Sequence, residues 1–180
     1  MAHTPPVSLV TSRLILRAAH REHAASLFKE YTGRNDTARY LQRAAHSSQV
    51  QTEAVIDAWG ENNWVAGNRF VWSILHRADE KAIGLFLMFI DGNNAEIHYG
   101  LGPAFWGQGL ATEAGIAVMD WVTERSSLLQ VSTRCAAEHT ASLRVLEKIG
   151  LHRRLLLPDE LLLTSTGVRT DAWLYSWKRP

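Results

Sequence analysis

A glycine-rich connection between a strand and a helix is the feature that most constrains this chain. Residues 95–101 alternate as in a strand, residues 110–123 place apolar side chains at helical spacing, and Gly107 and Gly109 lie between them. Glycine lets the backbone turn tightly and approach a ligand without a Cβ in the way. The first N–H groups of a helix lack partners inside it and carry partial positive charge. The segment therefore predicts a pyrophosphate site; the alternative is that the glycines serve turn geometry alone.

Two familiar nucleotide-binding motifs do not fit this segment. A dinucleotide fingerprint requires a third glycine where Thr112 stands, within a parallel unit. A P-loop requires Gly-Lys-Ser/Thr at its end, and no such lysine is present. The predicted anion site therefore belongs to neither class.

Hydrophobic periodicity and turn residues predict a mixed α/β sheet. Antiparallel strands come first along the chain, and a β-α-β unit follows the glycine-rich loop. Residues 32–46 show no pattern that assigns them. The predicted strands are 9–17, 70–76, 83–90, 95–101, 130–135, 151–157 and 170–177, and the predicted helices are 20–31, 48–59, 110–123 and 140–149.

Length and charge restrict the classes of function. The 180 residues fit one domain, 1–180, and 19 Lys+Arg against 18 Asp+Glu give a net charge of +1, which offers no electrostatic case for nucleic acid or an anionic membrane. A single cysteine, Cys135, excludes an internal disulfide and a zinc site with two thiolates, and no metal is expected. No signal peptide or apolar run of about 18 residues is evident, so we expect a cytoplasmic protein.

Three segments carry a resemblance to one family. Residues 106–111, Trp-Gly-Gln-Gly-Leu-Ala, resemble motif A of the GNAT superfamily of acetyl-CoA-dependent N-acetyltransferases, with Trp106 where the general pattern has Gln or Arg. Residues 11–17 and 140–151 resemble the first strand and a later helix of one branch, the ribosomal-protein N-terminal alanine/serine acetyltransferases. The resemblance covers about residues 9–157. It implies the GNAT fold, with about seven strands and about four helices, splayed beside a β-bulge at the cofactor site.

The resemblance also implies a set of residues for acetyl-CoA as co-substrate. The pantetheine arm would lie along the third strand of the central group, where a backbone N–H supports the thioester oxygen, and the glycine-rich loop would hold the pyrophosphate. The implied cofactor residues are Tyr99, Gly100, Leu101, Trp106, Gly107, Gln108, Gly109, Leu110, Ala111, Thr112, His139 and Ser142. His139 stands where the family usually has Asn, which places the geometry of that corner in question.

Glu96 is the predicted base that takes a proton from the amine. It shares one face of its strand with His98, which can join a proton relay. The alternative is a solvated carboxylate with a histidine packed beside it. Glu113, in the first turn of the next helix, is expected to serve structure instead.

Ser142 is the implied hydrogen donor to the departing thiolate, by resemblance to the serine at the start of the matching family helix. Relatives often carry a tyrosine one turn further on, where Leu146 stands here, so that tyrosine mechanism is absent. Either Ser142 or water then serves as the donor, or the thiolate leaves without help. The alternative role for Ser142 is to satisfy backbone N–H groups at the helix start.

The function implied is acetyl transfer to a primary amine by direct attack in a ternary complex. The branch favours a protein N-terminal α-amine as acceptor, and a small-molecule amine or antibiotic is the second choice. A non-catalytic acyl-CoA-binding module is the rival from another class. Dimers are common in this branch, so a homodimer stays open. Trp59, Trp64 and Trp72 are expected in the core or along the acceptor cleft.

Overall fold

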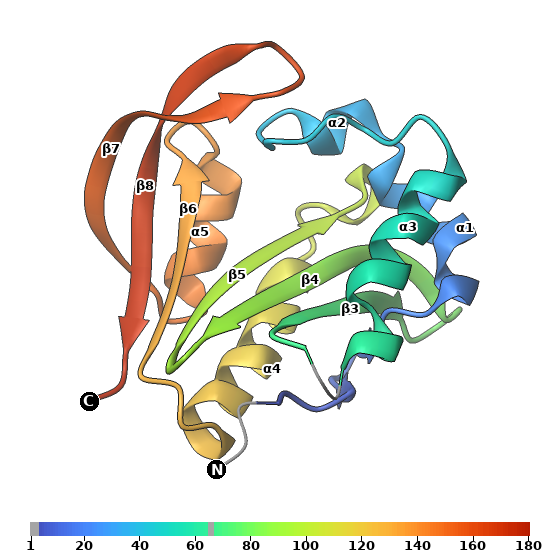
Figure 1. Ribbon diagram of the computed structural model, residues 1–180, viewed down its shortest axis with the longest axis horizontal. Helices are drawn as coiled ribbons and strands as arrows, with labels where there is room; N and C mark the ends of the chain where they lie inside the picture. Colours follow the sequence, from blue (N-terminus) through green and yellow to red (C-terminus); the bar gives the residue numbers. More distant parts are fainter. Residues whose placement is uncertain (1–3, 65–66) are drawn as a thin grey trace.

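The computed structural model describes residues 4–64 and 67–180, and an eight-stranded mixed sheet runs through them in the order β1-β2-β3-β4-β5-β6-β8-β7 (Figure 1). Neighbouring strands are antiparallel except β5 and β6, which are parallel. The strands are β1 (Ser8–Val10), β2 (Leu14–Ala18), β3 (Arg69–His76), β4 (Lys81–Asp91), β5 (Asn94–Leu101), β6 (Gln130–Ala136), β7 (His152–Leu163) and β8 (Val168–Lys178).

Helices cover both faces of this sheet. They are α1 (Ala24–Leu27), α2 (Asn35–Ala38), α3 (Gln49–Trp59), α4 (Leu110–Arg125) and α5 (Thr140–Lys148), together with the short turns η1 (Arg21–His23), η2 (Phe28–Thr32), η3 (Glu61–Asn63) and η4 (Pro103–Phe105). In β3, Phe70 and Trp72 pack in the cluster that contains the apolar side of α4, whereas Val71 packs with α1 and α3. Strands buried on both faces read as continuous apolar runs, which explains the sequence of β3 and β4.

The sheet parts between β5 and β6. These two strands pair only at Asn94↔Gln130, Ala95↔Val131 and Glu96↔Ser132, whereas β6 pairs with β8 along its full length. Figure 1 shows β5 and β6 diverging from a common lower end. Beyond Glu96 the edge of β5 that faces β6 has no strand beside it, although β4 pairs with β5 to its end at Leu101. The predicted splay is confirmed.

The bulge lies one strand away from the predicted place. The β4–β5 ladder has no register shift, whereas the β3–β4 ladder shifts between Ile74 and Leu75, opposite Gly84 and Ala82, so that Ile83 is the extra residue. The parting of β5 and β6 does not need a bulge in β5, because β6 stays with β8 and follows that strand away. The bulge instead places the Ile83 carbonyl where Gly102 N–H donates to it, at 2.8 Å, just after β5.

Several other elements differ from the sequence prediction. The predicted strand 9–17 is two strands, because the 11–13 turn is held by side-chain hydrogen bonds rather than by glycine or proline. The predicted helix 20–31 is η1, α1 and the π-helical turn η2, and that turn packs Tyr31 against Gly100, where a Cβ would meet the Tyr31 hydroxyl. The unassigned segment 32–46 contains α2, and β7 and β8 are longer than predicted.

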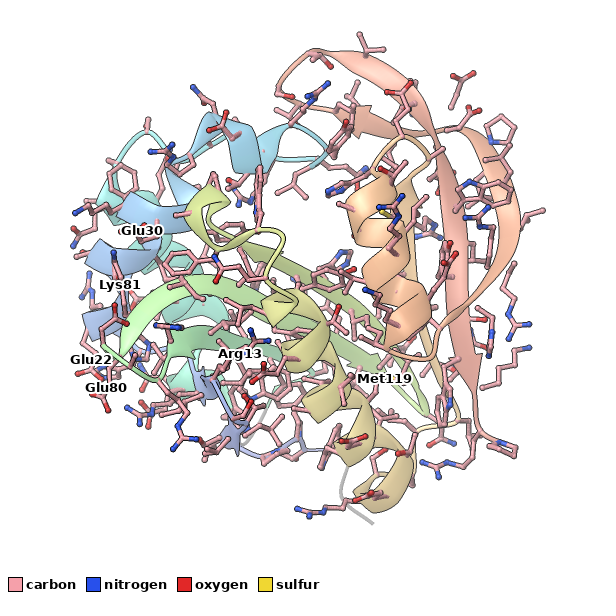
Figure 2. All side chains as sticks on the ribbon, turned by 180° about the vertical axis from the view of Figure 1, so that it is seen from behind. Arg13, Glu22, Glu30, Glu80, Lys81 and Met119 are labelled. Atoms are coloured by element: carbon pink, nitrogen blue, oxygen red, sulfur yellow. The ribbon has the colours of Figure 1, made fainter. Side chains whose placement is uncertain are left out.

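Glu113 on α4 holds the 11–13 turn. Its carboxylate accepts hydrogen bonds from Thr11 Oγ1 at 2.6 Å, from the Arg13 backbone N–H at 2.8 Å and from Arg13 Nε at 2.7 Å. Figure 2 shows Arg13 beside the first turns of α4. Burial raises the pKa of Glu113, but hydrogen bonds from Thr11, Arg13 and Ser12 outweigh it and lower the pKa to about 2. The structural role expected for Glu113 is confirmed.

Replacing this carboxylate weakens the fold in a pH-dependent way. Glu113→Gln should lower the free energy of unfolding by about 2 kcal/mol at neutral pH, since a charged acceptor of several donors is lost. The folded-state pKa lies below the ordinary 4.5, so the wild-type advantage is complete above pH 4.5 and disappears as the pH falls toward about 2. Urea unfolding of both proteins at several pH values measures this difference in unfolding free energy. Glu124→Gln, in the exposed last turn of α4, is the control; equal stability of Glu113→Gln and wild type at neutral pH contradicts the prediction.

Candidate active site

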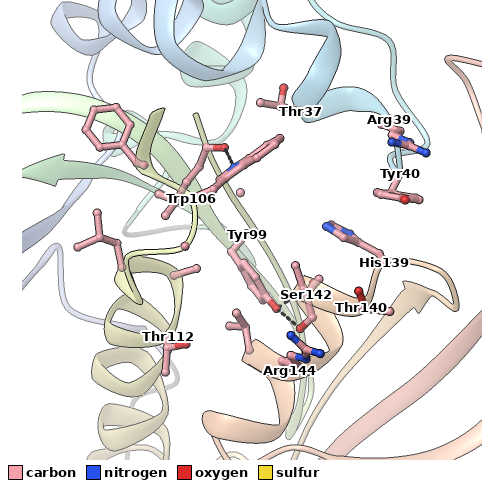
Figure 3. Close-up of a pocket in the computed structure, with 18 of the residues that line it drawn as sticks. Thr37, Arg39, Tyr40, Tyr99, Trp106, Thr112, His139, Thr140, Ser142 and Arg144 are labelled. Atoms are coloured by element: carbon pink, nitrogen blue, oxygen red, sulfur yellow. Dashed lines mark hydrogen bonds between the residues drawn. The ribbon is translucent and has the colours of Figure 1, made fainter. Parts of the chain in front are cut away.

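Two cavities meet where β5 and β6 part. The first, of about 690 Å³, runs from the glycine-rich loop to α5 (Figure 3), and the second, of about 470 Å³, lies toward α3. Leu110, which lines the first cavity, belongs to the core cluster on the α4 face of the sheet. Trp59, which lines the second, packs on the cluster on the α3 face, so the cavities approach the sheet from opposite faces. The residues that line both are Tyr31, Tyr40, Leu41, Tyr99, His139 and Ser142. A molecule in one cavity can therefore meet a molecule in the other at the gap between the strands.

The loop before α4 has the geometry of an anion site. Gly107 and Gly109 have φ of +73° and +76°, a left-handed conformation that favours glycine. α4 begins directly after Gly109, which offers no side chain to cap the first turn, and Leu110, Ala111 and Thr112 line the first cavity there. Helix N–H groups without a cap are suited to a phosphate.

Two contacts fix this loop in place. Trp106 Nε1 donates to the Leu101 carbonyl oxygen at 2.7 Å, and Arg13 Nη1 donates to the Gln108 carbonyl oxygen at 3.0 Å. Trp106 therefore ties the loop to the end of β5 while lining the first cavity (Figure 3). Gln108, in contrast, is not among the residues lining either cavity, and its side chain donates to the Ala104 carbonyl oxygen.

The open edge of β5 forms the floor of the first cavity. Tyr99, Gly100 and Leu101 line it, next to the gap left by β6. Their backbone is held on the other side by the ladder with β4. A rigid strand edge with no strand beside it is able to pair with an extended, amide-bearing ligand such as a pantetheine arm, and of its carbonyl oxygens that of Leu101 already accepts from Trp106.

His139 closes the junction from the α5 side. It stacks on Tyr40, with ring centroids 4.4 Å apart and planes 21° apart, and the two rings face each other in Figure 3. Tyr40 in turn packs on a small cluster formed by Ala136, Leu161 and Ala172. Burial lowers the pKa of His139, so the ring is neutral at neutral pH. The added bulk of histidine at this position therefore builds an aromatic wall.

Glu96 and His98 stand together in the second cavity. Glu96 Oε1 and His98 Nε2 are 3.0 Å apart, and each side chain is 41% exposed. The hydrogen bond from His98 lowers the pKa of Glu96, and it outweighs the opposing effect of burial. An ionised carboxylate in a cavity that adjoins the strand gap is placed to accept a proton from a bound amine.

Ser142 lies at the junction, in the first turn of α5. The Tyr99 hydroxyl lies 3.0 Å from Ser142 Oγ, and this contact is drawn in Figure 3. Leu146, one turn further along α5, lines the second cavity with an apolar side chain. Among the residues that line both cavities, Ser142, Tyr31, Tyr40 and Tyr99 carry hydroxyls, and position 146 carries none.

Several residues of the second cavity carry no sequence signal. Tyr40 and Leu41 come from the segment that the sequence leaves unassigned, and Arg134 Nε pairs with Glu160 Oε1 at 3.0 Å across two strands. Of the three tryptophans expected in the core or along the acceptor cleft, Trp59 lines this cavity, and Trp64 and Trp72 are buried in the core. Only the folding of distant segments brings such residues together.

Residues 4–64 and 67–180 contain neither a cluster of metal ligands nor a membrane-spanning helix. No group of His, Cys, Asp or Glu side chains in these ranges is arranged to hold a metal ion. No helix within the same ranges combines the length and apolar character needed to span a membrane.

The chain is similar to known proteins in sequence and in fold. The family model described as "Acetyltransferase (GNAT) domain" matches residues 13–152. An uncharacterized N-acetyltransferase, p20, of Bacillus licheniformis is 28% identical over 173 residues, covering 94% of each chain.

Among solved structures, RimL, a ribosomal L7/L12 alpha-N-protein acetyltransferase in complex with coenzyme A, has a TM-score of 0.82 at 20% identity and covers 97% of each chain. The Microcin C7 self immunity acetyltransferase MccE, in complex with acetyl-CoA and AMP, has a TM-score of 0.84 at 19% identity, covering 97% of this chain and 98% of its own. These likenesses show a shared fold.

Replacing a glycine of the loop before α4 by alanine tests the anion site. Gly107→Ala should weaken CoA binding about tenfold, because it strains a left-handed residue and adds a Cβ beside the ligand. Gly167→Ala in the β7–β8 turn is the matched control, since Gly167 has φ +69° and, like Gly107, open space around its added Cβ. Calorimetric titration with CoA compares the two. Equal losses of affinity in both variants contradict a ligand site at the loop.

Proposed function

The chain belongs to the GNAT acetyltransferase family, and from that premise we propose that it acetylates the N-terminal α-amine of a protein, using acetyl-CoA in a ternary complex in the cytoplasm. The observation that carries this proposal is the meeting of two cavities at the β5–β6 gap. One cavity contains the anion-binding loop, and the other contains the Glu96 carboxylate. An amine and a thioester can meet only where the cavities join.

The residues of the first cavity fit acetyl-CoA, which supplies the acetyl group as a thioester. The uncapped first turn of α4, with Gly107 and Gly109 before it, would hold the pyrophosphate. The edge of β5 at Tyr99–Leu101 would pair with the pantetheine amides, and a backbone N–H there would support the thioester oxygen as negative charge develops. Arg144 and Lys148 of α5 also line this cavity and add positive charge.

Glu96 serves as the base in this proposal. It takes a proton from the acceptor ammonium or amine, directly or through water, and the amine nitrogen then attacks the thioester carbonyl carbon. The His98 hydrogen bond holds the carboxylate ionised and oriented toward the second cavity. Ser142 supports the departing sulfur with a hydrogen bond from its hydroxyl as the C–S bond breaks.

A protein N-terminus is the first candidate for the acceptor that binds in the second cavity, and a small amine is the second candidate. The structural neighbour RimL acts on a ribosomal protein α-amine by its name, which favours the first. The cavity walls include Tyr31, Tyr40, Trp59 and Phe89, and rings of this kind suit a planar or apolar group attached to the amine. A small-molecule acceptor is therefore the alternative that a substrate panel must include.

CoA release measured with a panel of acceptors tests the proposed function. The panel holds peptides with free Ser or Ala N-termini and small aromatic and aliphatic amines, with the same peptides N-acetylated as controls. CoA release with the free peptides alone supports a protein N-terminus as the acceptor. CoA release with small amines alone contradicts it and supports a small-molecule acceptor. Selective calorimetric binding of acetyl-CoA over NAD and ATP without release from any amine contradicts the enzyme and favours an acyl-CoA-binding module.

Glu96→Gln should lower kcat about 100-fold and leave the KM for acetyl-CoA within about twofold, because the base is lost while the cofactor cavity is intact. Steady-state kinetics with the best acceptor of the panel measures both constants. Glu124→Gln on α4 is the control, since it removes an exposed carboxylate outside both cavities. An unchanged kcat in Glu96→Gln removes Glu96 from the mechanism.

A further inference from the structure

The hydroxyl of Tyr99 reaches from β5 to the start of α5. It lies 3.0 Å from Ser142 Oγ and 3.1 Å from the Ser142 carbonyl oxygen. The Tyr99 ring stacks against Phe86 of β4, with centroids 5.8 Å apart, so the core fixes the direction of the side chain. Tyr99 and Ser142 each line both cavities and therefore flank the place where thioester and amine meet (Figure 3).

We propose that Tyr99 is a positioning residue that acts through Ser142: its O–H sets the direction of the Ser142 hydroxyl and thereby the hydrogen bond that the departing CoA sulfur receives. This inference rests on the proposed function, in which Ser142 supports that sulfur. It adds a side-chain role to a residue whose backbone alone was expected to contact the cofactor.

The number of hydroxyl hydrogens explains how Tyr99 can direct the Ser142 hydroxyl. Each hydroxyl has one hydrogen to donate. When Tyr99 donates to the Ser142 carbonyl oxygen, the Ser142 hydroxyl can donate to Tyr99 Oη and its hydrogen is engaged. When Tyr99 donates to Ser142 Oγ instead, the Ser142 hydrogen is free to point at a sulfur in the junction. The change needs only a rotation of two O–H bonds, with the heavy atoms in place.

Tyr99 keeps its proton throughout this change. Burial raises its pKa well above the ordinary value, so the phenol is a neutral donor at every pH near neutrality. In the transfer step the amine nitrogen bonds to the carbonyl carbon, the C–S bond breaks and the sulfur leaves with the electron pair. The amine proton goes to Glu96, and neither Tyr99 nor Ser142 loses a proton.

Cys135 and Ser142 line the second cavity together. Burial raises the pKa of the Cys135 thiol on β6, and a hydrogen bond from Ser142 opposes that rise. Other titratable or charged groups around the pair are Tyr175 on β8, Glu138 and His139 before α5, Arg144 and Lys148 on α5, and Tyr31 and Tyr40 from the 31–40 segment. The second cavity adds the pairs Glu96–His98 and Arg134–Glu160.

The pH dependence of CoA binding tests this inference without an acceptor. A donor that stabilises the thiolate lowers the pKa of the bound CoA thiol below the pKa of the thiol in free CoA. A group whose pKa is lower in the complex binds more tightly as the pH rises, so the affinity for CoA should increase about fivefold from about pH 7 to about pH 9. Desulfo-CoA, which lacks the thiol, corrects for protein groups that titrate in the same range. Calorimetric titration of both ligands gives the corrected rise.

Tyr99→Phe and Ser142→Ala should each abolish this rise, and the double variant should behave like either single variant, because Tyr99 acts through Ser142. Ser142→Thr, which keeps a hydroxyl, should retain it. Tyr175→Phe is the matched control: this buried phenol bonds Glu147 and Arg153 outside both cavities and should leave the rise unchanged. Thermal unfolding verifies that each variant is folded.

The outcomes separate this inference from the proposed function. If Tyr99→Phe keeps the full rise, or if wild type binds CoA with no rise, the pair does not act on the sulfur and the inference is overturned, while acetyl transfer stands. If wild type binds neither CoA nor desulfo-CoA, the proposed function fails and the inference fails with it. A rise that is lost in Tyr99→Phe and kept in Tyr175→Phe supports the inference.

Discussion

β6 is bonded to β8 over seven residue pairs and to β5 over only three, and the candidate site depends on this inequality. β6 keeps its ladder with β8 to Ala136 and has no pair with β5 beyond Glu96↔Ser132. The gap exposes one edge of β5 and joins the two faces of the sheet. Without it, the cavity beside α4 and the cavity beside α3 would be separated by a continuous layer of backbone.

The gap stays open because the elements around it are fixed from outside. The ladder to β4 holds β5 to its end at Leu101, and the Glu113 carboxylate ties α4 to the 11–13 turn. On the far side, His139 and Tyr40 stack across the junction. Interiors are close-packed and resist deformation, so a site built between such elements holds its geometry. Preorganisation of this kind matters for acyl transfer, because its catalysis depends on placed donors more than on reactive side chains.

Local patterns in the sequence predict the parts of this site that local structure forms. The alternation in residues 95–101 places Glu96 and His98 together on one face, and the structure brings their side chains to 3.0 Å. The glycines before α4 have the left-handed φ values that the loop requires. Helix 140–149 and its glycine end follow from apolar spacing, and Gly150 has φ of +93°.

The rest of the site arises from contacts between distant segments, which periodicity does not encode. Tyr40 reaches the junction from a segment without helical or strand spacing, and its partner His139 is 99 positions later by their numbers. Tyr99 and Ser142 are 43 positions apart and meet only because β5 and β6 part. The bulge at Ile83 was likewise beyond prediction, because a single extra residue changes no apolar pattern in a strand buried on both faces.

Amide hydrogen exchange of the protein with and without acetyl-CoA tests the central claim most directly. If the parted strand edge and the loop before α4 form the cofactor site, binding should slow exchange in residues 99–101 and 107–112, while the β7–β8 turn around Gly167 should exchange as before. Protection confined to other segments, or bound acetyl-CoA without protection of β5, would contradict the assignment of the gap as the site.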